Sequence, residues 1–170
     1  MDIAPAVISQ YAAALSMLEE CVVACPDDLW NTDDAPNRFY QMVYHALFYT
    51  HLYVQPKGED FALWAKHIDG HQSFGGPTYP GGPIPPEGEP YTKDDILEYL
   101  AFCREQIASI VPTLDFEAEA GFPWLPFGKL ELQFYSIRHI MLHVGELAER
   151  LSAMRGIEVG WVGAGTIELD

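Results

Sequence analysis

The chain is poor in positive charge. Nine Lys and Arg residues stand against twenty-five Asp and Glu residues, which gives a formal net charge of −16 at pH 7. Because nucleic-acid binding relies on basic side chains that pair with phosphates, this balance predicts no nucleic-acid partner. The first basic residue is Arg38, so the amino end lacks the positive segment of a secretory signal and the Arg-rich character of a transit peptide. We therefore expect a cytoplasmic protein.

Long apolar runs are also scarce. The longest apolar stretch that we identify, residues 39–54, includes Gln41, His45 and His51. It is shorter than the roughly twenty apolar residues that a membrane-spanning helix needs. We therefore expect no membrane partner.

Cysteine is rare as well. The chain has three cysteines, an odd number, and Cys21 and Cys25 lie four residues apart rather than in the C-x-x-C spacing of redox and zinc motifs. We interpret them as reduced thiols. Catalysis through a cysteine is not favoured, because Cys21, Cys25 and Cys103 fall on or beside apolar helix faces, and buried thiols are generally inert.

The composition is typical of one folded domain. The 170 residues are 49% hydrophobic and 20% charged, which favours a single globular domain over residues 1–170 and argues against disorder. Apolar residues at steps of three and four predict helices. The expected helices cover about 3–25, 39–55, 93–111 and 137–154. This pattern predicts an all-α fold, most simply a four-helix bundle over about 3–154, with the first two helices as antiparallel neighbours.

Two segments do not fit a helix. Residues 70–90 hold six Gly and six Pro, so we expect residues 56–91 to form a long loop, and its aromatic residues favour packing over disorder. These aromatic residues are Phe61, Trp64, Phe74 and Tyr79. A loop of this length can cover a site and permits a crossover between helices. The Gly-rich tail, residues 155–170, is expected to be irregular.

Two histidines in the last helix carry the first chemical signal. His139 and His143 are four residues apart, which places their rings one turn apart on one helix face, as two ligands of one metal ion require. A third ligand must come from another helix, and the second expected helix offers His45 and His51. These two point about 240° apart around the helix, so only one can face the site. We choose His45 because its neighbours are more apolar, where an imidazole without a partner is costly.

A second H-x-x-x-H motif is formed by His67 and His71. Asp69 and Gly70 interrupt it and the Gly and Pro run follows, so a helical geometry is doubtful. We interpret these two as loop histidines without a metal, placed where they could line the entrance to a site.

Three neutral imidazoles leave coordination positions for water or substrate, which is the arrangement of a catalytic metal site. Nitrogen ligands suit zinc, nickel, iron or copper and disfavour calcium and magnesium, and we prefer zinc or nickel. Glu146, one turn beyond His143, is expected either to orient a ligand from behind, to act as a base, or simply to lie exposed on the helix.

With these residues the chain resembles the DinB-like (YfiT-like) superfamily of metal-dependent four-helix proteins. The resemblance is carried by V-Y-H-A-L around His45 and by R-H-I-M-L-H-V-G-E-L-A-E-R-L over residues 138–151, and it covers residues 3–154. It implies His45, His139 and His143 as the metal triad, an up-down-down-up bundle and a homodimer. Glu146 departs from the Gln common in the family, and the Gly and Pro rich insert is longer than expected. Characterised relatives include thiol transferases and a mycothiol-dependent isomerase.

Two functions follow from this reading. The first is a metal-dependent enzyme, a thiol S-transferase or hydrolase that acts on a small electrophile, with a low-molecular-weight thiol as a possible cofactor. In it the metal lowers the pKa of a bound thiol or water, and Arg138 or Arg150 could anchor a carboxylate, although an exposed helix Arg is more often solvated surface. The alternative is a non-catalytic bundle that binds a metal or a small ligand.

Overall fold

The computed structural model describes residues 2–33, 35–74, 76–77, 81–82 and 88–167. Within these residues there are five α-helices, three single 3₁₀ turns and no strand. The helices are α1 (Ala4–Ala24), α2 (Asp27–Trp30), α3 (Phe39–Val54), α4 (Lys93–Ile110) and α5 (Lys129–Arg155), and the turns are η1 (Gly58–Asp60), η2 (His71–Ser73) and η3 (Val111–Thr113). The prediction of an all-α fold is confirmed.

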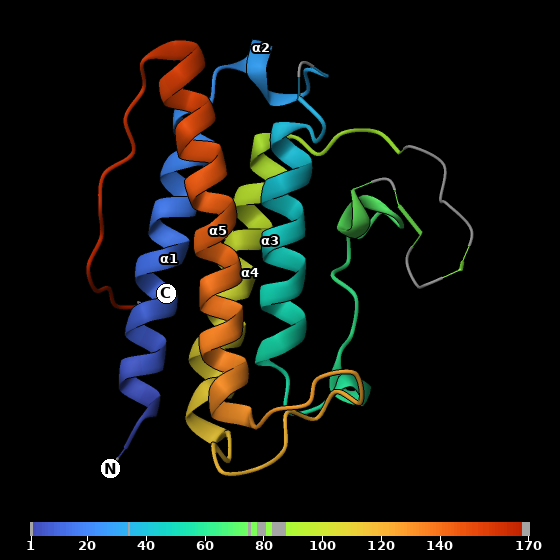
Figure 1. Ribbon diagram of the computed structural model, residues 1–170, viewed down its shortest axis with the longest axis vertical. Helices are drawn as coiled ribbons and strands as arrows, with labels where there is room; N and C mark the ends of the chain where they lie inside the picture. The colour runs from blue at the N-terminus through green and yellow to red at the C-terminus, as the bar shows by residue number, and fades with distance from the viewer. Residues whose placement is uncertain (1, 34, 75, 78–80, 83–87, 168–170) are drawn as a thin grey trace.

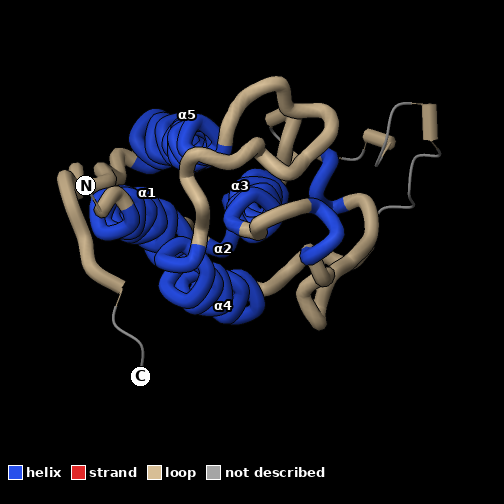
Figure 2. Tube along the Cα trace, turned by 90° about the horizontal axis from the view of Figure 1, so that it is seen from below, coloured by secondary structure: helices blue, strands red, loops and turns tan. Residues whose placement is uncertain are grey.

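The four long helices pack around one core (Figures 1 and 2). Both α4 and α5 contact α1, and both also contact α3. The end-on view in Figure 2 shows α1 and α3 on a diagonal, with α4 and α5 between them. The prediction that the first two long helices are neighbours is therefore wrong. The short α2 and the residues after it carry the chain across the end of the helices, so a short connection here joins diagonal partners.

The helix ends follow from local chemistry. Thr92 caps α4, because its hydroxyl accepts from the backbone N–H of Asp95 while the Asp95 carboxylate accepts from the backbone N–H of Thr92. α5 ends at Arg155 and is followed by Gly156, which has φ 66°, a conformation that glycine adopts without strain. At its other end α5 begins at Lys129, earlier than the apolar stripe from Ile137 indicated.

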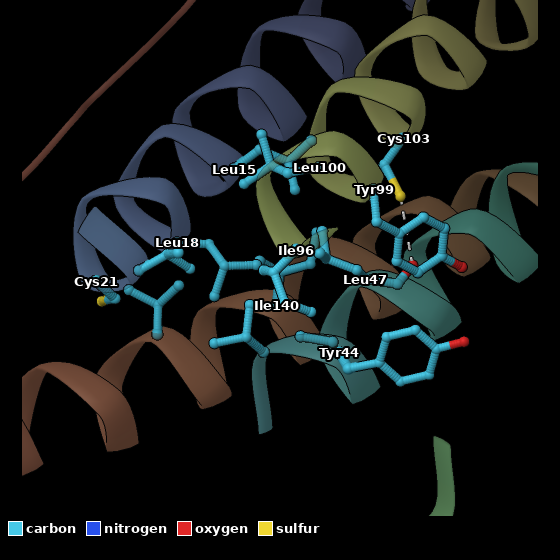
Figure 3. Close-up of a cluster of buried hydrophobic side chains, with 14 of the residues drawn as sticks. Leu15, Leu18, Cys21, Tyr44, Leu47, Ile96, Tyr99, Leu100, Cys103 and Ile140 are labelled. Atoms are coloured by element: carbon cyan, nitrogen blue, oxygen red, sulfur yellow. Dashed lines mark hydrogen bonds between the residues drawn. The ribbon is translucent and has the colours of Figure 1, made fainter. Parts of the chain in front are cut away.

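The core is a continuous set of buried apolar side chains from all four long helices. Figure 3 shows part of it, where Leu15 and Leu18 of α1 meet Ile96 and Leu100 of α4. Burying each such side chain contributes about 1.5–3 kcal/mol. α1 is so apolar that its length and composition would allow it to cross a membrane, but more than half of that stretch is buried against the other helices, as in a core helix of a globular protein.

The segment between α3 and α4 packs through aromatic rings. Trp64 stacks on Tyr99 of α4 with ring centroids 4.5 Å apart, and Tyr91 stacks on Tyr44 of α3 at the same distance. The expectation that aromatic residues hold this segment against the helices is met for Phe61, Trp64 and Phe74, while Tyr79 lies outside the described residues. The segment thus covers the side of α3 that faces away from α1 (Figure 2).

A buried lysine joins the ends of α3 and α5. The Lys129 side chain is 3% exposed, and its ammonium donates to the backbone carbonyls of Gln55 (3.3 Å), Pro56 (2.6 Å) and Ala120. Burial lowers the pKa of Lys129. The ammonium thereby supplies hydrogen-bond donors to backbone carbonyls just after the last turn of α3. Carbonyls at the end of a helix have no hydrogen-bond partner within the helix.

The described part of the tail has neither helix nor strand, as expected. It runs back along α1, where the Gly160 N–H donates to Glu20 Oε1 (3.1 Å) and the Gly165 N–H donates to the Ser9 carbonyl (3.2 Å). A Cβ at Gly165 would lie about 3.0 Å from Ala12, a contact so tight that a larger residue would require the helix or the tail to shift by a few tenths of an ångström.

Candidate metal centre

Three histidines from two helices converge on one point. The His45 Nε2 atom lies 3.0 Å from His139 Nε2, and the His143 Nε2 atom lies 3.1 Å from the same His139 atom. The potential ligand atoms of the three rings lie within 4.8 Å of one another. His45 comes from α3, and the other two come from adjacent turns of α5, which packs beside α3. The three residues expected as ligands are thus brought together.

The outer nitrogen of two of the rings is fixed by an acceptor. His45 Nδ1 donates to the Gln72 carbonyl at 2.7 Å, and His143 Nδ1 donates to Glu146 Oε2 at 2.8 Å. A carbonyl and a carboxylate can only accept, so these contacts place the proton of each neutral ring on Nδ1. The Nε2 lone pairs of His45 and His143 therefore face the shared point.

The three inner nitrogens fit a cation better than they fit one another. A single proton on His139 Nε2 can satisfy only one of the two lone pairs that face it. A metal ion at about 2.0–2.1 Å from each nitrogen would hold neighbouring nitrogens about 3.0–3.4 Å apart, close to the two separations observed. The donor set is nitrogen alone, which suits zinc, nickel, copper or iron and does not suit calcium or magnesium.

Burial favours the neutral form of two of these rings, those of His45 and His139. Loss of water contact lowers the pKa of His45 to about 3, opposed by its hydrogen bond to Gln72 and reinforced by the other two histidines. Burial also lowers the pKa of His139 to about 4, with a smaller contribution from His143. At pH 7 both rings carry free lone pairs, as metal ligation requires.

Aromatic rings surround the three histidines. Phe74 stacks on His45 with ring centroids 4.1 Å apart, and Tyr49 packs edge-on against His139 at 5.6 Å. Phe74 has φ 53°, an uncommon conformation for a residue with a side chain. The loop contributes the Gln72 carbonyl, which sequence analysis missed, and the Phe74 ring, which was expected to pack but was not assigned to the site. No periodicity in a Gly and Pro rich segment signals either position.

The other histidines lie elsewhere. His51, which we excluded as a ligand, is 2% exposed, and its Nδ1 lies 3.1 Å from the Tyr99 hydroxyl. In the loop, His67 Nδ1 lies 2.6 Å from the Tyr44 hydroxyl, and His71 packs against the Tyr91 ring. None of the three belongs to the cluster that could hold a metal.

The remaining candidate residues also have definite positions. Glu146 is about half exposed and accepts from His143, a geometry that orients the ring. Arg150 Nη1 donates to the Asn37 carbonyl at 3.0 Å, and the Arg138 guanidinium lies 5.6 Å from the Tyr135 ring centre.

All three cysteines are buried, and burial raises the pKa of Cys21 and Cys25 to about 12, so they lack the reactive thiolate form at pH 7.

Comparisons with known proteins do not extend this picture. No family model, no curated protein and no solved structure matches the chain. The functional assignment therefore rests on the geometry of His45, His139 and His143.

Proposed function

We propose that the protein is a metal-dependent enzyme, a thiol S-transferase or hydrolase that acts on a small electrophile. The observation that carries the proposal is the convergence of three imidazoles, His45, His139 and His143, with two of their Nε2 separations at 3.0 and 3.1 Å. The proposed ion is divalent zinc or nickel, bound by these three nitrogens. A small-molecule thiol is the proposed co-substrate in the transferase form of the reaction.

Different residues have different roles in the proposed reaction. Such an ion, when bound, lowers the pKa of a thiol or water beside it, so that a nucleophile exists at neutral pH. His45, His139 and His143 leave further coordination positions for that molecule. Gln72 and Glu146 fix the rings of His45 and His143, and the rings of Phe74 and Tyr49 exclude water from the side that they cover.

We also propose that the chain has the DinB-like architecture, an up-down-down-up four-helix bundle. In Figure 1, α1 and α5 run upward while α3 and α4 run downward, and the long segment before α4 crosses back along the bundle. This arrangement and the ligand order, one histidine on α3 followed by two on α5, support the proposal. The cytoplasmic location and the absence of nucleic-acid and membrane partners stay predictions.

The test combines metal content with turnover. Wild-type protein loaded with zinc or nickel should hold one ion per chain by elemental analysis and should transfer a thiol to, or hydrolyse, members of a panel of small electrophiles. His45→Ala should lose both properties, while His51→Gln on the same helix should keep both. Retention of the full metal content by folded His45→Ala protein would overturn the proposed site.

A second outcome of the same experiment would distinguish the alternative, a non-catalytic bundle, from the proposed enzyme. If the wild type binds the ion through His45 but turns over no electrophile with any thiol or with water, the protein is a non-catalytic metal-binding bundle. The hydrogen bond from His143 to Glu146 favours this alternative, because that carboxylate already has a partner and is less suited to act as a base.

A further inference from the structure

A hollow lies between the start of α1 and the first half of α5. Its volume is about 360 Å³, within the range of roughly 300–1,000 Å³ that is typical of small-ligand pockets. Apolar side chains form most of its lining: Ile3, Ala6, Val7, Phe134 and Ile137. Phe134 is 60% exposed, although a large apolar side chain is more stable out of water. The hollow therefore favours an apolar guest that covers Phe134.

Two polar side chains, Gln10 and Arg138, complete the lining, and both are exposed. The Arg138 guanidinium lies 5.6 Å from the Tyr135 ring centre and forms no ion pair with any residue in the described part of the chain. Gln10 Nε2 donates to the Gly163 carbonyl at 3.1 Å, and a Gln amide has a second N–H to donate. The apolar hollow thus has hydrogen-bond donors and one positive charge at its edge.

The surroundings of the hollow differ in charge from the rest of the molecule. The chain has 25 acidic residues, but residues 3–18, which include the α1 wall of the hollow, contain no charged side chain. On α5, the nearby Glu131 lines a separate, smaller cavity and does not line this hollow. Arg138 is therefore the charged group of the lining, and it favours an anion at a place where the acidic surface does not repel one.

We propose that this hollow binds a free aliphatic monocarboxylate of medium chain length, such as octanoate. Its hydrocarbon chain packs against the apolar lining and covers Phe134. Its carboxylate accepts hydrogen bonds from the Arg138 guanidinium, whose planar array of N–H groups matches two carboxylate oxygens, and from the Gln10 amide. The inference goes beyond the proposed function and requires no metal, because none of the three site histidines lines the hollow.

The lining also determines which acids fit. Arg138 supplies one positive charge, and the other walls are almost entirely apolar, so a second charge or a polar group within the hollow would lose its water without gaining a partner. Each methylene that moves from water into the hollow should strengthen binding by about fourfold, until the hollow is full. These two properties distinguish a chain with one carboxylate from a dicarboxylate of the same length.

Calorimetric titration of the metal-free full chain with a series of fatty acids, from butyrate to dodecanoate, tests the proposal. Affinity should rise by about fourfold for each methylene and then stop rising at the chain length that fills the hollow. Octanedioate should bind more weakly than octanoate. Affinity that continues to rise up to dodecanoate would indicate adsorption without a defined site and would overturn the proposal.

Two variants test the position of the ligand. Ala6→Phe fills the hollow from an exposed position and should abolish binding of both octanoate and neutral octanol, whereas Val23→Phe, at a residue 67% exposed elsewhere on α1, should change neither. Arg138→Gln should weaken octanoate about fivefold and leave octanol unchanged. Arg155→Gln, at an arginine that pairs with Asp28, is its matched control. Circular dichroism shows whether each variant remains folded.

The metal site provides an independent control. His45→Ala should leave octanoate affinity unchanged, so the two proposals can fail separately. The proposal is wrong if folded wild type binds no octanoate, or if Ala6→Phe or Arg138→Gln leaves octanoate affinity unchanged. Loss of octanoate binding in His45→Ala would place the carboxylate at the histidines instead. Octanoate affinity that falls as protein concentration rises would identify a second copy of the chain as the occupant and would also overturn the proposal.

Discussion

The molecule contains two histidine pairs of identical spacing, and only one of them faces a common point. On α5, His139 and His143 lie on one helix face with their Nε2 atoms 3.1 Å apart. In the loop, Gly70 between His67 and His71 has φ 93°, so the backbone there is not helical. His67 instead contacts Tyr44, and His71 contacts Tyr91. The difference shows that an i, i+4 spacing brings two side chains together only where the backbone between them is helical.

The two pairs also differ in what lies behind the rings. Polar acceptors, Gln72 and Glu146, hold the histidines of the candidate centre and turn their lone pairs inward. Aromatic rings surround the loop histidines, which serve as packing elements between the loop and α3. Substitutions on each side can test this distinction between site histidines and packed histidines.

The largest difference is expected from removing one imidazole of each pair. His139→Ala should weaken zinc binding by about 100-fold or more, because it removes a ligand, whereas His67→Ala should leave the affinity unchanged. Competition with a chromogenic chelator measures both affinities. Equal losses of zinc affinity in the two variants would show that the site histidines and the packed histidines do not differ in metal binding.

The carboxylate beside each pair gives the next difference. Glu146→Gln keeps an acceptor for His143 but removes the charge, so zinc affinity should fall by about tenfold. Asp69, whose Oδ1 atom lies 3.9 Å from His67 Nε2, provides the matched control, and Asp69→Asn should have no effect on affinity. Calorimetric titration of both variants checks this, and an unchanged affinity in Glu146→Gln would show that the ring needs no charged acceptor.

A change on the packed side should act on stability alone. Tyr44→Phe removes the hydroxyl that pairs with His67 Nδ1 at 2.6 Å and should lower the free energy of unfolding by about 1 kcal/mol. Zinc affinity should remain that of the wild type. Urea unfolding with a parallel metal titration distinguishes the two effects, and a loss of affinity would link the packed histidines to the centre.

The smallest effect concerns His51, a third packed histidine. Burial lowers its pKa from 6.5 to about 4, so the unfolded chain binds this proton more readily than the folded chain. Stability from this group is complete above pH 6.5 and is lost as the pH falls toward 4. Between roughly pH 7.5 and 5.5, metal-free wild type should lose about 1 kcal/mol more than His51→Gln. Thermal unfolding measures both proteins, and identical pH profiles of stability for wild type and His51→Gln would contradict the lowered pKa of His51.

Much of the candidate centre could be predicted because helices have a fixed period. The pairing of His139 with His143 follows from 3.6 residues per turn, and the apolar neighbours of His45 distinguished it from His51. Gln72 and Phe74 could not be found in the same way, because their positions depend on a left-handed residue in a loop without periodicity. The diagonal placement of α1 and α3 was missed for a related reason, since connection length alone does not specify a partner.

The buried ammonium of Lys129 has a mechanical consequence for the centre. It ties the end of α3 to the start of α5, the two helices that supply all three imidazoles. Ten residues separate Lys129 from His139, or about 15 Å along the helix axis, so a tilt of about 4° at the tied end would displace the ring by about 1 Å. A displacement of that size exceeds the tolerance of a coordination bond. Lys129, although distant from the three histidines, therefore affects how their rings align.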